Sequence, residues 1–165
     1  MAFGLGTTLI SCAIAVWVIP LNDSLGALDS RLQILVLCTL LPALTLAVAI
    51  GRLAAQRFRT PQDINGSGLT SGTEQAKVLQ ALLQNTLEQL ALSLPVYTAW
   101  AVLAPPRLMT ALPVASLLFL LGRALFFWGY HRGAPSRSIG FTLTFYPTLL
   151  LLAGALILGF RSIGS

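Results

Sequence analysis

Apolar stretches of about the length that a lipid bilayer requires dominate this sequence. The chain has 165 residues, of which 56% are hydrophobic and only 9% are charged. A spanning helix needs about 20 apolar residues, and so few charges do not cover the surface of a water-soluble globule. The sequence therefore predicts an all-α integral membrane protein that crosses the bilayer several times. The apolar blocks lie at 2–20, 32–54, 77–104, 111–130 and 139–160.

The first apolar block allows two interpretations. Residues 2–20 carry no charge, but they lack the basic start of a secretory signal, and two glycines and Pro20 weaken them as a helix. We expect an additional N-terminal hydrophobic helix here; the alternative is a segment that lies outside the bundle. The chain then divides into an N-terminal hydrophobic segment with an outer loop at 1–31 and a four-helix membrane domain at 32–165.

Basic residues gather on one side of the predicted bundle. The chain has ten Lys and Arg against five Asp and Glu, a net charge of +5. One side, formed by the 57–77 loop and the 131–138 connection, holds Arg52, Arg57, Arg59, Lys77, Arg132 and Arg137; the other holds Arg31, Arg107 and Arg161. The positive-inside rule places the 57–77 loop in the cytoplasm, and in a bacterium the protein in the inner membrane. Topology explains the charge, so no nucleic-acid partner is expected.

Polar residues interrupt two of the apolar blocks. Asn85 and Glu88 lie three residues apart and hence on one helix face. A carboxylate is costly in hydrocarbon, so Glu88 is expected to face the bundle interior, a wet cavity or a basic partner. Arg123 in the next block is the partner that we expect, with Tyr130 two turns further on the same side. The pair is either a staple between two helices or part of a binding site.

Two further patterns concern helix packing. Pro42, Pro95 and Pro147 lie inside apolar blocks and predict kinks, because membrane helices tolerate proline where neighbouring groups restore the lost hydrogen bonds. Small residues at four-residue spacing predict a stripe for close helix packing. This stripe consists of Ala43, Ala47, Gly51 and Ala55.

A group of basic residues at the cytoplasmic end is able to converge on an anion. Arg52, His131, Arg132 and Arg137 belong to it. Guanidinium groups bind carboxylates through paired donors, and a nearby positive charge lowers the pKa of a thiol. A ligand that carries a thiol and carboxylates fits this pattern, although a single arginine here is more often a positive-inside anchor.

Other site chemistry lacks its residues in this sequence. His131 is the only histidine, and Cys12 and Cys38 form no CxxC pair, so no metal site is expected. No phosphate-binding glycine loop is found, and Ser138 has no evident triad partners. No internal repeat favours a transporter.

Three stretches resemble the MAPEG superfamily, the membrane-associated proteins in eicosanoid and glutathione metabolism. The clearest is RALFFWGYHRGAPSRSIGF at 123–141, with an Arg, a Gly-Tyr seven residues on and a further Arg after a short turn. NTLE at 85–88 is similar to the family's N-x-x-E, and RLAAQRFRTPQD at 52–63 resembles the end of its first helix and the following loop. The resemblance covers roughly 32–161. It implies a four-helix transmembrane bundle of MAPEG type, to which the N-terminal hydrophobic helix is an addition.

The resemblance also implies a function. Family members form trimers that bind glutathione between subunits near the cytoplasmic side. Carried over by position, the residues that hold glutathione would be Arg52, Asn85, Glu88, Arg123, Tyr130 and Ser138. Arg137 would be the catalytic residue, because it would stabilise the glutathione thiolate for attack on a lipophilic electrophile or peroxide. The implied activity is that of a membrane-bound glutathione transferase or peroxidase, a homotrimer whose partners are membrane lipid and a small hydrophobic substrate.

The sequence departs from the family pattern at the implied site. Ala81 stands where catalytic members usually carry a basic residue, and Gln84 also replaces a position that is often basic. Phe126 occupies a place where tyrosine is common. These departures keep open an alternative, a non-catalytic lipid-binding or structural membrane protein of the same fold.

Overall fold

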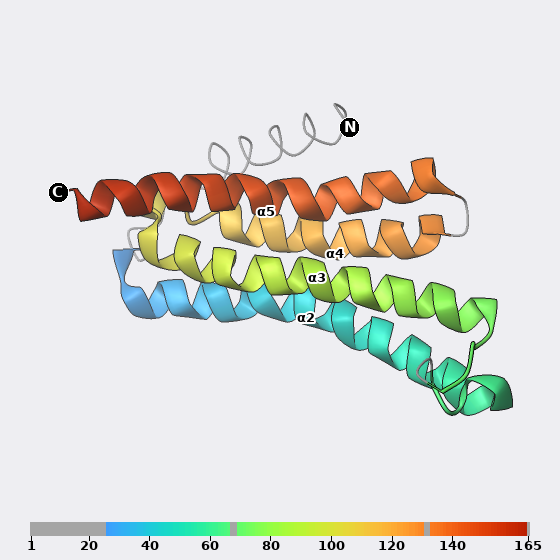
Figure 1. Ribbon diagram of the computed structural model, residues 1–165. Coiled ribbons are helices and arrows are strands. Elements are labelled where there is room, and N and C mark those ends of the chain that lie inside the picture. Colours follow the sequence, from blue (N-terminus) through green and yellow to red (C-terminus); the bar gives the residue numbers. More distant parts are fainter. Residues whose placement is uncertain (1–25, 67–68, 131–132, 165) are drawn as a thin grey trace.

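The computed structural model describes residues 26–66, 69–130 and 133–164. This part of the chain forms four long α-helices and no strand. They are α2 (Leu28–Arg59), α3 (Glu74–Leu103), α4 (Ala111–Gly129) and α5 (Ala134–Ile163), with 3-10 turns η2 (Pro61–Asp63) and η3 (Pro106–Leu108) in the connections. The helices run side by side and antiparallel, and the α2–α3 and α4–α5 connections lie at the same end (Figure 1). The predicted all-α bundle is confirmed, while the helix expected at 2–20 falls outside the described residues.

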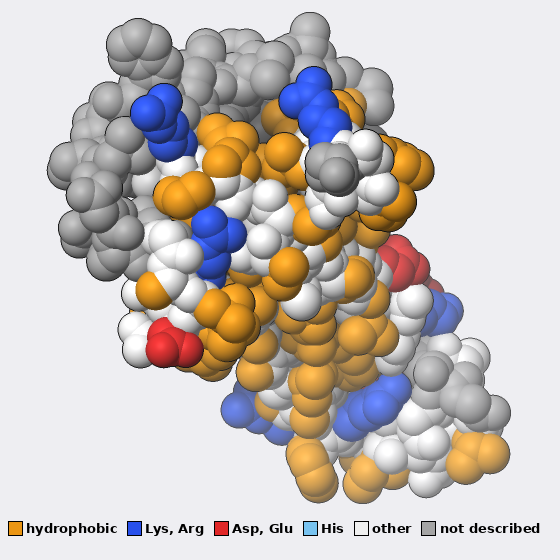
Figure 2. Space-filling model, turned by 90° about the vertical axis from the view of Figure 1, so that its left-hand side faces the viewer, with side chains coloured by type: hydrophobic (Ala, Val, Ile, Leu, Met, Phe, Trp, Pro, Cys, Tyr) orange, Lys and Arg blue, Asp and Glu red, His pale blue; other side chains and the backbone are white. Residues whose placement is uncertain are grey.

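Three segments of the described chain are long and apolar enough to cross a membrane. They are Leu28–Arg59, Pro106–Gly129 and Ser136–Ile163. The helix α3 lies in the same bundle, but a run of polar side chains lowers its hydropathy: Gln80, Gln84, Asn85, Glu88 and Gln89. Large hydrophobic side chains are exposed along the helices. Figure 2 looks along the bundle and shows hydrophobic side chains between the charged groups at one end. Such a surface suits contact with lipid.

The ends and interiors of the helices follow local signals in the sequence. Pro42, Pro95 and Pro147 all lie inside helices and end none of them, as expected. At the start of α3, the Oγ1 of Thr73 accepts a hydrogen bond from the backbone N–H of Ala76 at 3.2 Å, the usual N-cap contact. At its other end, Nη1 of Arg31 donates to the carbonyl oxygen of Ala104 at 2.8 Å, so a cation meets the carboxyl end of the helix.

The helices α4 and α5 approach each other closely through glycines. A Cβ added at Gly140 would collide with the backbone of Phe126 and Gly122, and one added at Gly129 would lie 2.6 Å from the carbonyl oxygen of Ser136. Larger residues at these positions would therefore push the two backbones apart. This contact holds the start of α5 against the end of α4.

The small-residue stripe predicted on α2 does not pack helices together within the chain. Ala43, Ala47 and Gly51 are exposed, and a Cβ at Gly51 would meet nothing within 4 Å. The buried face of α2 instead carries Thr45 and Ala49. These two residues lie two positions from the stripe, which is about 200° around the helix. Within the single chain the stripe therefore makes no close helix contact, because it points away from the bundle.

Candidate functional site

A cavity of about 500 Å³ opens between α3, the end of α4 and the start of α5. Its volume lies in the range of small-molecule sites, which is roughly 300 to 1,000 Å³. The structure brings five of the predicted site residues to this cavity: Asn85, Glu88, Tyr130, Arg137 and Ser138. The remaining wall consists of Ala81, Gln84, Phe126 and Phe141. Polar groups from three helices thus meet against an aromatic wall.

The turn between α4 and α5 places Arg137 at the cavity. Gly133 adopts a positive φ of 94°, which glycine permits and which reverses the chain before α5. The half-buried Arg137 follows in the first turn of α5, with its guanidinium 5.1 Å from the ring centroid of Tyr130. This distance is typical of a cation–π contact. The tyrosine ring therefore restrains the cation at the cavity wall.

The ion pair expected between Glu88 and Arg123 is not formed. Glu88 is exposed, and its Oε1 accepts a hydrogen bond from Nε2 of Gln84 at 3.0 Å. Arg123 is fully buried and donates to Oδ1 of Asn85 at 2.8 Å and to Oγ1 of Thr144 at 3.0 Å. Neutral partners thus bind two of the guanidinium nitrogens without the desolvation of a carboxylate. The Glu88 carboxylate therefore lines the cavity without Arg123 as its partner.

Arg123 orients a cavity residue and does not itself line the cavity. Because Nη1 of Arg123 donates to the amide oxygen of Asn85, the NH₂ group of Asn85 remains as a donor for a ligand. The guanidinium also lies 4.4 Å from the ring centroid of Phe126, another wall residue. Arg123 thus acts on the cavity through Asn85 and Phe126.

Sequence reasoning missed Thr144 and Phe141. The hydroxyl of Thr144 accepts a hydrogen bond from the buried guanidinium of Arg123. The same hydroxyl donates to the carbonyl oxygen of Phe141 at 2.9 Å. Thr142 and Thr148 make similar bonds to their own helix, so a threonine in an apolar block carries no signal of a second partner. Phe141 lines the cavity and is one more aromatic residue in an apolar helix. Only the packing of α5 against α4 distinguishes it.

Arg52 lies apart from the other predicted site residues. It is exposed on α2, and its guanidinium stands 5.6 Å from the ring centroid of Phe127. It does not line the cavity of its own chain. His131 and Arg132, which belonged to the predicted basic group, lie outside the described residues.

The arrangement suits a small, polar ligand that carries both a positive and a negative charge. The Glu88 carboxylate attracts a cationic group, and Arg137 attracts an anion such as a carboxylate or a thiolate. The Asn85 amide and the Tyr130 and Ser138 hydroxyl groups add hydrogen-bonding capacity. The aromatic wall excludes water from one side of such a ligand, which strengthens these electrostatic interactions.

Comparisons with known proteins identify the family of the chain. The model of the MAPEG family matches residues 32–157 of the chain. A protein of Synechocystis sp., named only as uncharacterized, is 34% identical over 114 residues, which cover 69% of this chain and 77% of that protein. No solved structure matches the chain. Because the family match covers well over half of the chain and includes all the cavity residues, the chain belongs to the MAPEG family.

Proposed function

We propose that the protein is a membrane-bound glutathione-dependent transferase or peroxidase that acts on lipophilic electrophiles. Membership of a glutathione-related membrane family supports the general class. The observation that carries the proposal is the meeting of Glu88, Asn85 and Arg137 at one cavity. Glutathione carries an ammonium group, amides and a thiol, for which Glu88, Asn85 and Arg137 in that wall are the complementary groups.

In the proposed mechanism Arg137 stabilises the glutathione thiolate by its charge. A cation beside the sulfur lowers the thiol pKa, by about one to two units, and so raises the thiolate fraction at neutral pH. The sulfur then forms a bond to the electrophilic carbon, while the leaving group departs with its electron pair. The thiol proton passes to solvent. Tyr130 keeps the guanidinium in place, and Arg137 forms no covalent bond itself.

We propose a homotrimer as the active form. Glu88 and Arg52 are both exposed on helices of the single chain. Exposed charges within the membrane are costly, so a neighbouring copy that covers them would lower the free energy of the assembly. Arg52 would then serve the cavity of a neighbouring subunit, with glutathione between the two chains. A hydrophobic substrate would reach this cavity from the surrounding lipid.

The proposal is tested by ultraviolet difference absorbance of the glutathione thiolate during titration into the purified protein at neutral pH. We expect a saturable thiolate signal that Arg137→Ala loses. Arg137→Lys should keep part of it, because lysine retains the positive charge but lacks the planar guanidinium with its paired donors. Arg161→Ala removes an exposed arginine near the other end of α5 and is the matched control. An equal signal in Arg137→Ala and the wild type would remove Arg137 from the mechanism.

One observation favours the second candidate, a non-catalytic lipid-binding or structural protein. Ala81 and Phe126 contribute only apolar surface to the cavity, and Arg123 is occupied by contacts within the bundle. The absence of any thiolate signal in a correctly folded wild-type protein would favour this candidate. Retained phospholipid in the same sample, measured by mass spectrometry, would then support a lipid-binding role.

A further inference from the structure

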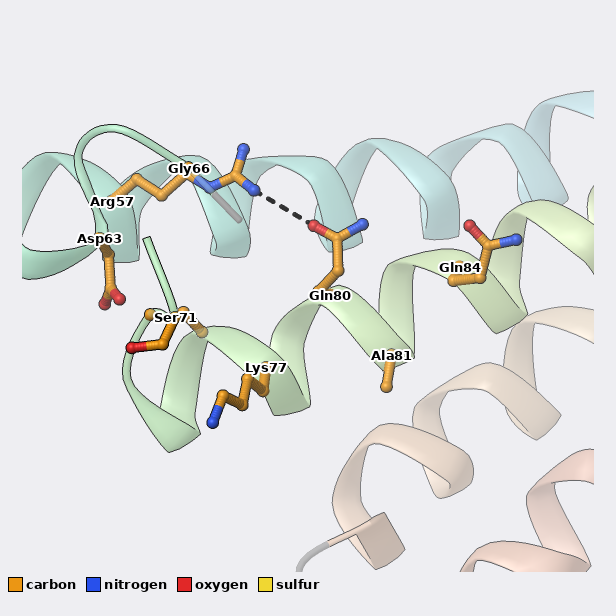
Figure 3. Close-up of a pocket in the computed structure, with 10 residues that line it drawn as sticks. Arg57, Asp63, Gly66, Ser71, Lys77, Gln80, Ala81 and Gln84 are labelled. Atoms are coloured by element: carbon orange, nitrogen blue, oxygen red, sulfur yellow. Dashed lines mark hydrogen bonds between the residues drawn. The ribbon is translucent and has the colours of Figure 1, made fainter. Parts of the chain in front are cut away.

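A second cavity of about 370 Å³ lies beside the candidate site. It is bounded by the end of α2, the loop before α3 and the first half of α3 (Figure 3). The two cavities share Ala81 and Gln84 in their walls. The methyl group of Ala81 is the smallest side chain that this helical position can carry apart from glycine. The wall common to the two cavities is therefore thin.

The walls of the second cavity favour an anionic group. Arg57 is half-buried, and its Nη2 donates to Oε1 of Gln80 at 3.2 Å (Figure 3). Lys77 also lines the cavity and has one exposed partner, Glu74, at 2.7 Å. An ion pair in contact with water contributes little, so Lys77 is readily available to a ligand.

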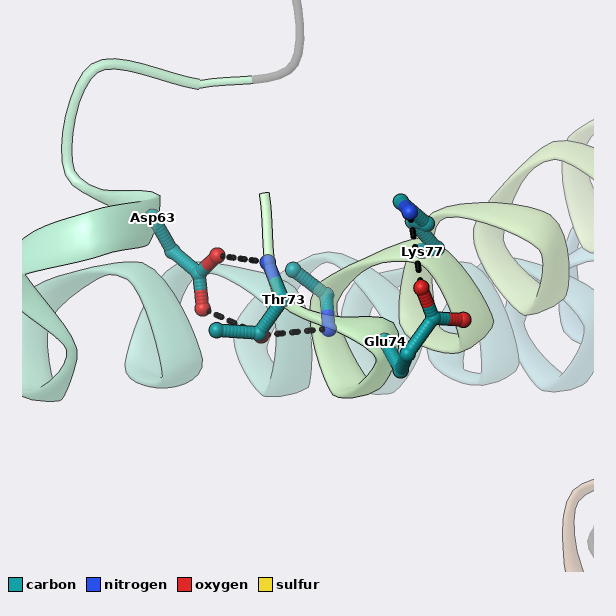
Figure 4. Close-up of polar contacts among 5 residues, drawn as sticks. Asp63, Thr73, Glu74 and Lys77 are labelled. Atoms are coloured by element: carbon teal, nitrogen blue, oxygen red, sulfur yellow. Dashed lines mark hydrogen bonds and ion pairs between the residues drawn. The ribbon is translucent and has the colours of Figure 1, made fainter. Parts of the chain in front are cut away.

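Asp63, the one carboxylate among the described residues of this wall, is already engaged. Asp63 accepts hydrogen bonds from the backbone N–H and the hydroxyl of Thr73, both at 2.7 Å (Figure 4), and from Nε2 of Gln56 at 3.1 Å. The backbone hydrogen bond from Thr73 outweighs the opposing effect of burial and, together with the side-chain hydrogen bonds and the charge of Arg57, lowers the pKa of Asp63. Asp63 thus stays ionised and holds the loop, while Arg57 and Lys77 leave the cavity with an excess of positive charge.

The separation along α3 between the level of the Arg57 guanidinium and Glu88 slightly exceeds the length of an extended tripeptide backbone. The contact with Gln80 places the Arg57 guanidinium near the level of Gln80 on α3, eight residues before Glu88. At a rise of 1.5 Å per residue this separation is about 12 Å. A fully extended peptide spans about 3.5 Å per residue, so three residues cover roughly 10 Å and four cover roughly 14 Å.

We propose that the two cavities form one elongated site and that Arg57 and Lys77 bind the anionic end of a ligand longer than a tripeptide. The anionic group is a carboxylate or a phosphate, and the thiol end lies at Arg137. This inference rests on the proposed function for the first cavity. Ala81 is the position that determines ligand length, because a larger side chain there would separate the two cavities.

The experiment compares three peptides by calorimetric titration into the protein in phosphatidylcholine nanodiscs, which contain no anionic headgroup. The peptides are glutathione and its extensions by a C-terminal glutamate or glutamine. We expect the glutamate peptide to bind about fivefold more tightly than the glutamine peptide, since only its side chain carries the added charge. Arg57→Gln should abolish this preference. Arg59→Gln is the control, because Arg59 is exposed on the same helix and lines neither cavity.

A second variant tests the connection between the cavities. Ala81→Leu keeps an apolar, helix-forming residue but fills the shared wall, so it should weaken the binding of both extended peptides more than that of glutathione. Equal binding of the two extended peptides to the wild type would overturn the elongated site, even if glutathione binds. Charge-dependent binding of the extended peptide without glutathione binding would support the site and overturn glutathione as the cosubstrate. Failure of all three peptides to bind would overturn both.

Discussion

At the scale of the residue, Arg123 shows how a buried charge is held inside a membrane bundle. It contacts Asn85, Thr144 and the ring of Phe126, and none of its surface is exposed. Its Nε is buried without a hydrogen-bond partner in the described structure, so the hydrogen-bonding capacity of the guanidinium is only partly used. Removal of the side chain would leave two polar partners unpaired and a cavity beside Phe126.

We therefore expect Arg123→Ala to lower the free energy of unfolding by about 3 kcal/mol. The measurement is denaturant unfolding in detergent, followed by tryptophan fluorescence. Arg107→Ala, at an exposed arginine of η3, should change stability by less than about 0.5 kcal/mol. If the two variants unfold alike, the hydrogen bonds of Arg123 contribute no net stability.

At the scale of the element, the glycine contact between α4 and α5 positions the candidate site. Gly140 lies against the backbone of Phe126, and Arg137 lies one turn earlier on α5. Any separation of the two helices would move Arg137 away from Tyr130. The geometry of the cavity thus depends on a contact that involves none of its charged groups.

We expect Gly140→Ala to destabilise the protein by about 2 kcal/mol or more, because the added Cβ collides with backbone that cannot rotate away. Gly159→Ala is the matched control in the same helix, since a Cβ there would lie 3.5 Å from Cδ1 of Leu103, an ordinary contact. Thermal unfolding of both variants gives the comparison. Equal melting temperatures would show that α4 and α5 separate at little cost.

At the scale of the whole molecule, the charges that a single chain exposes on its helices favour association with a further copy, which the homotrimer that we propose would supply. Native mass spectrometry of the protein released from nanodiscs should show three chains together. The Arg137→Ala variant should still assemble from three chains, because Arg137 lies within the wall of its own cavity. A monomer at concentrations that saturate the thiolate signal would refute a site shared between subunits.

Much of the architecture could be predicted from the sequence. Apolar blocks of bilayer length predict the helices, since the backbone in lipid must satisfy its hydrogen bonds internally. The interior positions of Pro42, Pro95 and Pro147 are confirmed in the helices. Two of the three family-like stretches, at 85–88 and 123–141, also contain the five predicted residues that meet at one cavity.

The sequence by itself determined the fold class, the family and the residue types at the candidate site, because hydropathy and short motifs are local properties of the chain. Which groups contact each other was decided by the tertiary structure. Arg123 binds Asn85 and Thr144 in place of Glu88, and Gly140 provides the close contact expected of the α2 stripe. Both outcomes depend on the rotation of each helix about its axis, which is set by packing against neighbours from distant parts of the chain.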